Sequence, residues 1–353
     1  MAQSDPEQPP YEIRGWDFGD DDFAFGIRVN GCRFTIPISP ESFSNSPIAL
    51  SLFRNILAKV IAGEDDDPEV WDYGEQVANV FPPEFKRLAP PVVHTGKLTL
   101  ADLAPRGAFE CEYRVIDEGP LAVGITERVP EMEPCDEWNI CKIQSAFPVL
   151  DHHEVEVPYS EGCRIYDIIP QRVIVNGQQF FYKSSWSPSD PIDEIGKYAK
   201  IKASNPPLEH LHMSRLFGIV AYPNGQTKGL LYEWIETGRH GTLWSTIKPD
   251  TPLSTRQKWA GQIRETVAAL HKLGVVWGDI KPDNVLIDNN KNAVVIDLEG
   301  GTTRGWVDHD VGGTLEGDMQ GMERMIDFIF NDEAPLRLDA SSDTGYSEDM
   351  DED

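Results

Sequence analysis

The sequence is poor in basic residues and has no long apolar runs. Its 353 residues include 31 Lys and Arg against 59 Asp and Glu, so the formal net charge is −28. A chain this acidic repels phosphate backbones and anionic lipids, which argues against nucleic acid or a membrane surface as its partner. No run approaches the roughly 18 apolar residues that a membrane span needs. We therefore expect no nucleic-acid partner and no membrane partner.

Paired cysteines and a signal segment are also lacking. The five cysteines lie far apart and contain no C-x-x-C pair: Cys32, Cys111, Cys135, Cys141 and Cys163. This pattern predicts free thiols in a reducing compartment rather than a disulfide framework or a zinc site. The first residues, MAQSDPEQPPYE, contain neither a basic stretch nor an apolar stretch, so we expect no secretory signal. The sequence thus predicts a cytoplasmic, intracellular protein.

The chain is long enough for two domains, and its apolar fraction of 40% is enough for a sizeable core. A stretch rich in Pro, Glu and Asp over residues 129–160 places their boundary near residue 150. We predict a disordered tail over 1–10, an acidic α+β domain over 11–150, a second domain over 151–337 and a disordered tail over 338–353. The last fifteen residues hold seven acids and no base, which is typical of a solvated tail.

The first domain has patterns that predict structure but none that predicts chemistry. Alternating apolar residues around Asn30-Gly31 predict a hairpin over 23–38. A helix is predicted over 47–62, with Ser46 as its N-cap. Short apolar runs predict strands over 92–100, 108–116 and 121–129.

Two clusters of possible metal ligands have weak patterns. The acidic run 64–67 lacks the spacing of a calcium loop, so we expect an exposed, solvated loop. His152 and His153 are adjacent, so they would point in different directions on a strand or a helix. Without an H-x-x-x-H spacing they predict a metal site only weakly.

Residues 254–301 form the most informative segment. Ser254 with Gln257 three residues later matches a capping box, which predicts a helix from there to about Leu273. The apolar residues Ile263, Val267 and Leu270 would form its buried face.

Four polar side chains follow that helix. Asp279, Lys281 and Asn284 lie in one loop, and two short strands then lead to Asp297. Carboxylate and amide oxygens suit Mg²⁺, and a lysine offers a mobile positive charge to a transferred phosphoryl group. A further Asp can orient a hydroxyl nucleophile. This combination predicts phosphoryl transfer, in which positioning and electrostatics provide most of the catalysis.

These residues resemble the eukaryotic protein kinase family, most closely the kinase-like proteins of fungi. Residues 277–284, WGDIKPDN, match its H-R-D-x-K-x-x-N catalytic loop, and residues 297–299 match D-F-G. The resemblance implies an α+β fold with a small β-rich N-lobe and a short helical C-lobe. It also implies that Asp279 orients the acceptor hydroxyl, that Lys281 stabilises the γ-phosphate of ATP, and that Asn284 and Asp297 hold Mg²⁺.

The resemblance also assigns residues upstream. A hairpin over 172–185 contains Asn176-Gly177 and has Lys183 at the end of its second strand, where it resembles the strand lysine that pairs with the α/β-phosphates of ATP. In the following helix, Glu194 is the best match to the glutamate that pairs with this lysine, and Asp193 is a neighbouring alternative.

Further along, Glu233, Trp234 and Ile235 resemble the hinge whose backbone binds adenine, with Tyr232 at the mouth of the back pocket. Asp318 resembles the aspartate that begins the next large helix and braces the catalytic loop.

The chain also departs from the family pattern. Trp277 stands in the place of the catalytic-loop histidine, and Glu299 replaces the glycine of D-F-G. No G-x-G-x-x-G precedes Lys183, because that stretch contains one glycine, Gly162. No A-P-E motif follows Asp297, so we expect a truncated C-lobe.

Three hypotheses follow from the matches and the departures. The first is an ATP- and Mg²⁺-dependent phosphotransferase that acts on a Ser/Thr hydroxyl, with a protein as substrate or partner. The second is a pseudokinase scaffold that binds nucleotide weakly or not at all. The third is a small-molecule kinase of the aminoglycoside type.

Overall fold

The computed structural model describes residues 11–62, 67–128, 146–160, 163–185, 191–204, 210–222, 227–301, 303 and 305–337. Both predicted tails, Gly162 and most of the run 64–67 lie outside these residues. The chain divides into two compact units, Met1–Glu133 with Glu156–Pro170 and Pro134–Val155 with Gln171–Asp353. This division differs from a single cut at residue 150, because residues 156–170 return to the first unit.

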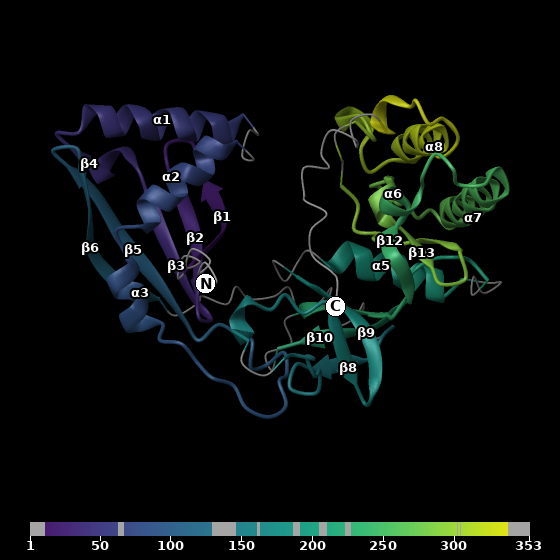
Figure 1. Ribbon diagram of the computed structural model, residues 1–353, viewed down its shortest axis with the longest axis horizontal. Helices are drawn as coiled ribbons and strands as arrows, with labels where there is room; N and C mark the ends of the chain where they lie inside the picture. Colours follow the sequence, from purple (N-terminus) through teal and green to yellow (C-terminus); the bar gives the residue numbers. More distant parts are fainter. Residues whose placement is uncertain are drawn as a thin grey trace, which may run out of the picture. The chain divides into compact units, whose positions relative to one another are not determined.

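The first unit is built on a mixed β-sheet (Figure 1). Its strands are β1 (Glu12–Phe18), β2 (Phe23–Val29), β3 (Cys32–Ile38), β4 (Phe43–Ser44), β5 (Gly107–Ile116) and β6 (Gly119–Arg128). They run in the order β1-β2-β3-β5-β4, and β6 pairs with β5. The pairs β3–β5 and β4–β5 are parallel, and the other pairs are antiparallel.

Helices cover one face of this sheet. They are α1 (Pro47–Ile61), α2 (Pro68–Ala78) and α3 (Pro82–Leu88). Every second residue of β2 and β3 is buried, and these residues share a core with apolar side chains of the helices. The predicted hairpin is confirmed: Asn30 and Gly31 have φ values of 45° and 82°, the left-handed values that its tight turn requires.

The start of α1 is where the sequence predicts it, but the capping group is different. Ser46 occupies the N-cap position, and its side chain makes no capping hydrogen bond to the helix. The Glu118 carboxylate accepts hydrogen bonds from the backbone N–H groups of Ile48 and Ala49, both at 2.9 Å. A carboxylate from the β5–β6 turn therefore caps a helix about 70 residues earlier in the sequence.

One other expectation for the first unit is wrong. No strand forms over 92–100, where Thr99 makes an isolated bridge to Glu156. Asp67 belongs not only to an acidic run but is the N-cap of α2: its side chain accepts a hydrogen bond from Glu69 N at 2.8 Å. The sequence patterns also missed β1, α2 and α3.

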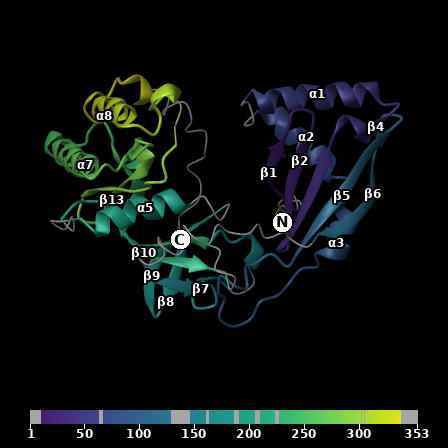
Figure 2. The ribbon, with the colours of Figure 1, turned by 180° about the vertical axis from the view of Figure 1, so that it is seen from behind.

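The second unit contains two sheets (Figures 1 and 2). The larger sheet has the order β7-β10-β11-β9-β8, and the smaller has the order β12-β13-β14. In the larger sheet β7 pairs in parallel with β10, and the remaining neighbours are antiparallel. The strands are β7 (Val149–Asp151), β8 (Arg172–Val175), β9 (Gln178–Ser184), β10 (Leu216–Ala221), β11 (Thr227–Glu233), β12 (Thr237–Thr242), β13 (Val285–Asp288) and β14 (Ala293–Val295).

The helices of this unit share one apolar core with both sheets. They are α5 (Pro191–Lys202), α6 (Leu243–Thr246), α7 (Leu253–Lys272) and α8 (Leu315–Phe330). The predicted buried face of α7, formed by Ile263, Val267 and Leu270, is confirmed. Its predicted capping box is wrong, because Pro252 is the N-cap and Ser254 lies inside the first turn.

Three general expectations can be compared with the described residues. Among them, no helix combines the length and the apolar character that crossing a membrane requires. Cys32, Cys111 and Cys163 are free thiols, while Cys135 and Cys141 lie outside the described part of the chain. The mixture of sheets and helices agrees with the predicted α+β class.

Candidate functional site

A lysine near the end of β9 lies among three carboxylates. Lys183 Nζ is 2.9 Å from Glu194 Oε2, 2.7 Å from Asp297 Oδ1 and 2.8 Å from Glu299 Oε2. Glu194 belongs to the first turn of α5, and the other two carboxylates follow β14. Of the two acidic candidates in α5, Glu194 makes the contact. The cluster therefore joins three segments that are far apart in the sequence.

Burial and charge oppose each other in this cluster. Burial acts to lower the pKa of Lys183, but the Glu194 and Asp297 carboxylates outweigh it and raise this pKa above its usual value. Burial raises the pKa of Glu194, and the facing ammonium group opposes that shift. Lys183 is therefore an ammonium ion at neutral pH. The ligand oxygens of the three carboxylates lie within 4.8 Å of one another, a spacing that also suits a divalent cation.

The backbone that presents Asp297 is held from two sides. Asp297 has a φ of 59°, a left-handed conformation that costs free energy for a residue with a side chain. The Trp277 indole Nε1 donates hydrogen bonds to the carbonyl oxygens of Ile296 and Asp297, both at 3.0 Å. Lys197 Nζ donates to the carbonyl oxygen of Leu298 at 2.6 Å. The fully buried Trp277 thus supports the loop at the position where the resemblance expects a histidine.

A second polar group surrounds Asp279. Its Oδ2 atom is 2.8 Å from Lys281 Nζ and 3.1 Å from Asn284 Nδ2. The Asn284 amide also donates to the carbonyl oxygen of Asp279 at 2.9 Å, which fixes the loop between the two residues. On the other side, the Thr303 hydroxyl donates to Asp279 Oδ1 at 2.8 Å and accepts a hydrogen bond from Lys281 Nζ at 2.9 Å.

Asp318 anchors the start of this loop. Its Oδ2 atom accepts a hydrogen bond from Trp277 N at 2.8 Å and is 2.7 Å from His271 Nε2. Its Oδ1 atom accepts from Gly278 N at 2.8 Å. The side chain of Asp318 is fully buried, and it lies in the first turn of α8. One carboxylate therefore connects α8, the end of α7 and the backbone next to Asp279.

Two glycines allow the Asp279 loop and the Asp297 loop to approach closely. Gly278 and Gly300 both have a φ of 94°, a value that favours glycine. A Cβ atom on Gly278 would lie 2.8 Å from the Cα atom of Gly300, which is shorter than any real contact. A side chain at position 278 would therefore push the Asp279 loop and the Asp297 loop apart.

The β13–β14 hairpin links the two polar groups. Val285 pairs with Val295, and Ile296 N donates to the carbonyl oxygen of Asn284 at 3.0 Å. Asn284 thus lies opposite the residue that precedes Asp297. Asn284 uses its amide nitrogen on Asp279, which leaves its amide oxygen as an acceptor in the segment paired with the start of the Asp297 loop. An amide oxygen and a carboxylate are a donor set that fits Mg²⁺.

The hinge candidates lie at the end of β11, the strand beside β9. In this pair Leu230 is opposite Lys183 and Glu233 is opposite Phe180. Glu233 N donates to the carbonyl oxygen of Arg215 at 3.0 Å. The Trp234 ring lies 5.8 Å from the Arg172 guanidinium group. No direct contact links Glu233, Trp234 or Ile235 to Lys183 among the interactions of the described residues.

Sequence reasoning missed two residues of this region. Thr303 contacts Asp279 and Lys281, although it lies more than 20 residues after them. Lys197 reaches the backbone of Leu298 from the next turn of α5 after Glu194. Neither residue has a local motif, because threonines after glycines and a helical lysine are both common.

The comparison with family models agrees with this location. Residues 201–304 match the model described as Protein kinase domain. The match supports a protein kinase-like family and a kinase-like fold for this part of the chain. It includes Asp279, Lys281, Asn284 and Asp297, and it begins after Lys183. No curated protein matches the chain.

Proposed function

We propose that this chain is an ATP-dependent phosphotransferase that moves the γ-phosphoryl group to a Ser/Thr hydroxyl of a protein substrate. The observation that supports this most is the cluster in which Lys183 meets Glu194 and Asp297. It brings a strand lysine and a helix glutamate from outside the matched segment 201–304 to an aspartate inside it. In this proposal the second unit is a kinase-like fold with a β-rich lobe and a helical lobe.

Asn284 and Asp297 are the residues that would hold Mg²⁺, because they offer an amide oxygen and a carboxylate at neighbouring positions. Bound Mg²⁺ would supply positive charge that offsets the phosphate oxygens of ATP. Lys183 would bind the α/β-phosphates, held in place by Glu194 on its buried side. The backbone of residues 233–235 would bind adenine.

Asp279 would orient the acceptor hydroxyl and accept its proton. Its Oδ1 atom already accepts a hydrogen bond from a threonine hydroxyl, that of Thr303, at 2.8 Å. Lys281 lies 2.8 Å from the other oxygen of Asp279, where its charge would stabilise the transferred phosphoryl group. Asn284 and Lys281 together hold the Asp279 carboxylate, so little reorganisation is required when a hydroxyl approaches.

Asp279→Asn tests this proposal directly. We expect phosphate transfer from labelled ATP with Mg²⁺, to the chain itself or to a generic protein acceptor. Loss of a general base typically lowers the rate about 10²–10⁴-fold, so transfer by Asp279→Asn should fall to near background. Asp283→Asn is the matched control, because it makes the same change at an exposed position in the same loop. Equal transfer by both variants would overturn the role of Asp279.

One observation favours the pseudokinase hypothesis as a second candidate. Glu299 occupies Lys183 with an ion pair of 2.8 Å, and this contact competes with phosphate for the same ammonium group. A pseudokinase would bind ATP weakly or not at all, and it would show no transfer that depends on Asp279. Measuring transfer and nucleotide binding on the same preparation separates the two candidates.

A further inference from the structure

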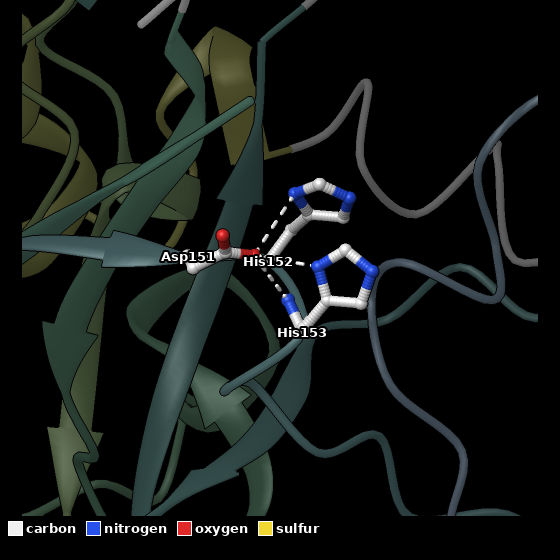
Figure 3. Close-up of side chains that lie close together, drawn as sticks. All are labelled: Asp151, His152 and His153. Carbon is white, nitrogen blue, oxygen red and sulfur yellow. Dashed lines mark hydrogen bonds and ion pairs between the residues drawn. The ribbon is translucent and has the colours of Figure 1, made fainter. Parts of the chain in front are cut away.

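The turn after β7 places three possible metal ligands around one point (Figure 3). Asp151 Oδ1 is 2.7 Å from His153 Nδ1 and 3.4 Å from His152 Nδ1. It also accepts a hydrogen bond from His153 N at 2.9 Å. Both imidazole rings therefore present the same ring nitrogen to the same carboxylate oxygen, and the three lines in Figure 3 converge on that oxygen.

The local backbone explains why these two adjacent histidines do not point apart. Adjacent residues point apart on a strand or a helix, but the strand ends at Asp151 and a turn follows. Glu154 N donates to the carbonyl oxygen of Asp151 at 2.9 Å, which closes this turn. The centroids of the His152 and His153 rings consequently lie 4.4 Å apart. The turn thus brings together two imidazoles that a regular element would separate.

Neighbouring elements hold one ligand and leave the other two accessible. The β7–β10 pairing places Asp151 opposite Ala221, and His152 Nδ1 is 3.4 Å from the carbonyl oxygen of Ala221. The side chain of His152 is 7% exposed, and its ring lies against that of Tyr222. The side chains of Asp151 and His153 are 49% and 66% exposed. An ion could therefore enter from solvent and meet a fixed imidazole.

The spacing suits a small divalent ion. Ligands at about 2.1 Å from a tetrahedral ion lie about 3.4 Å from one another. The distance of 3.4 Å between Asp151 Oδ1 and His152 Nδ1 already has this value. The shorter contact to His153 is a hydrogen bond that would open by rotation of an exposed side chain. The Ala221 carbonyl oxygen also lies 3.4 Å from His152 Nδ1, and a water molecule would supply the fourth ligand if this oxygen does not.

We propose that Asp151, His152 and His153 form a binding site for a borderline divalent metal ion of the zinc class. Two imidazoles and one carboxylate favour Zn²⁺, Co²⁺, Ni²⁺ or Cu²⁺ over Mg²⁺ or Ca²⁺, which prefer oxygen ligands alone. Each imidazole would bind through Nδ1 and keep its proton on Nε2. The remaining coordination position stays open to water. Bound metal would connect the turn to the edge of the larger sheet through His152.

Cobalt titration tests this site. Co²⁺ is added to the full chain without an affinity tag, and its visible absorption is recorded. We expect one saturable Co²⁺ site whose bands disappear when Zn²⁺ is added, and which excess Mg²⁺ leaves unchanged. His153→Ala and Asp151→Asn should each weaken binding at least tenfold. Both positions are exposed, so both variants should fold, and circular dichroism checks this.

His94→Ala is the control, because it removes a half-buried histidine from the first unit. It should bind Co²⁺ as the unchanged chain does. Glu299→Gln removes a carboxylate from the acidic cluster around Lys183 and should also leave the cobalt bands unchanged. The cobalt result therefore does not depend on whether the proposed phosphotransferase activity is correct. The proposal is overturned if the unchanged chain shows no saturable cobalt bands, or if His153→Ala and Asp151→Asn bind Co²⁺ as tightly as it does.

Discussion

The two units bury different kinds of side chain. Among the described residues, the buried polar side chains of the first unit are the serines Ser42 and Ser46. The second unit buries charged and amide groups as well, namely Glu194, Arg256, Asp279, Asn284 and Asp318. The core of the first unit is instead rich in aromatic rings, such as Phe25 and Phe34. One unit thus excludes charge from its interior, and the other gathers it.

The difference indicates where the chemistry lies. Removing a charged group from water costs free energy unless partners compensate for it, so a fold has reason to bury charge where function needs it. Most of the buried charges of the second unit belong to the two loops around Asp279 and Asp297 or to their supports. We expect substitutions in the first unit to change stability alone, and substitutions in these loops to change ligand binding and transfer.

Phe34→Ala should have the largest effect on stability. Phe34 is fully buried and stacks on Phe109 with ring centroids 4.9 Å apart. Removing a buried phenylalanine side chain costs about 4 kcal/mol of free energy of unfolding, which denaturant titration measures. The stabilisation of the second unit by ATP with Mg²⁺ should persist. If that stabilisation disappears as well, the contrast between the units fails.

Asp318→Asn should have the next largest effect. The carboxylate faces Trp277 N, Gly278 N and His271, and an amide can accept from only one side. We expect a loss of about 3 kcal/mol in the free energy of unfolding, together with reduced transfer, because a buried donor loses its charged acceptor. Glu316→Gln, an exposed change in the first turn of the same helix, is the control. Equal stability of the two variants would contradict the bracing role.

Glu299→Gln should have the smallest effect and should raise nucleotide affinity. The Glu299 side chain is 45% exposed, so its ion pair with Lys183 is worth at most about 1 kcal/mol. Removing this charge frees Lys183 for phosphate, and we expect the dissociation constant for ATP to fall several-fold in a calorimetric titration. Weaker binding by this variant would show instead that Glu299 takes part in holding the metal ion.

Local signals in the sequence predicted the parts of the fold that depend on local geometry. The Asn30-Gly31 and Asn176-Gly177 turns were predictable because both residues must adopt left-handed conformations, and both do. The helix over 47–61 was predictable from its apolar spacing. Residues of the Asp279 loop were recognisable because the chemistry requires their types at fixed spacing.

Long-range contacts explain the features of the fold and the site that the sequence did not predict. The Glu118 cap of α1 and the Thr303 contact with Asp279 depend on residues brought together only by the fold. Ser254 matched a capping box by chance, since the helix already begins at Leu253. The orientation of His152 and His153 depends on the end of a three-residue strand, a boundary that sequence patterns do not resolve.

The most direct test of the account is the thermal stability of the chain with ATP and Mg²⁺. At 100 times its dissociation constant, a ligand that binds only the folded state adds about 2.7 kcal/mol of stability. We predict such a stabilisation for the unchanged chain and its loss in Lys183→Met, which keeps the length of the side chain but removes the ammonium group that faces Glu194 and Asp297. No stabilisation of the unchanged chain, or an equal stabilisation of both, would contradict a nucleotide site at Lys183.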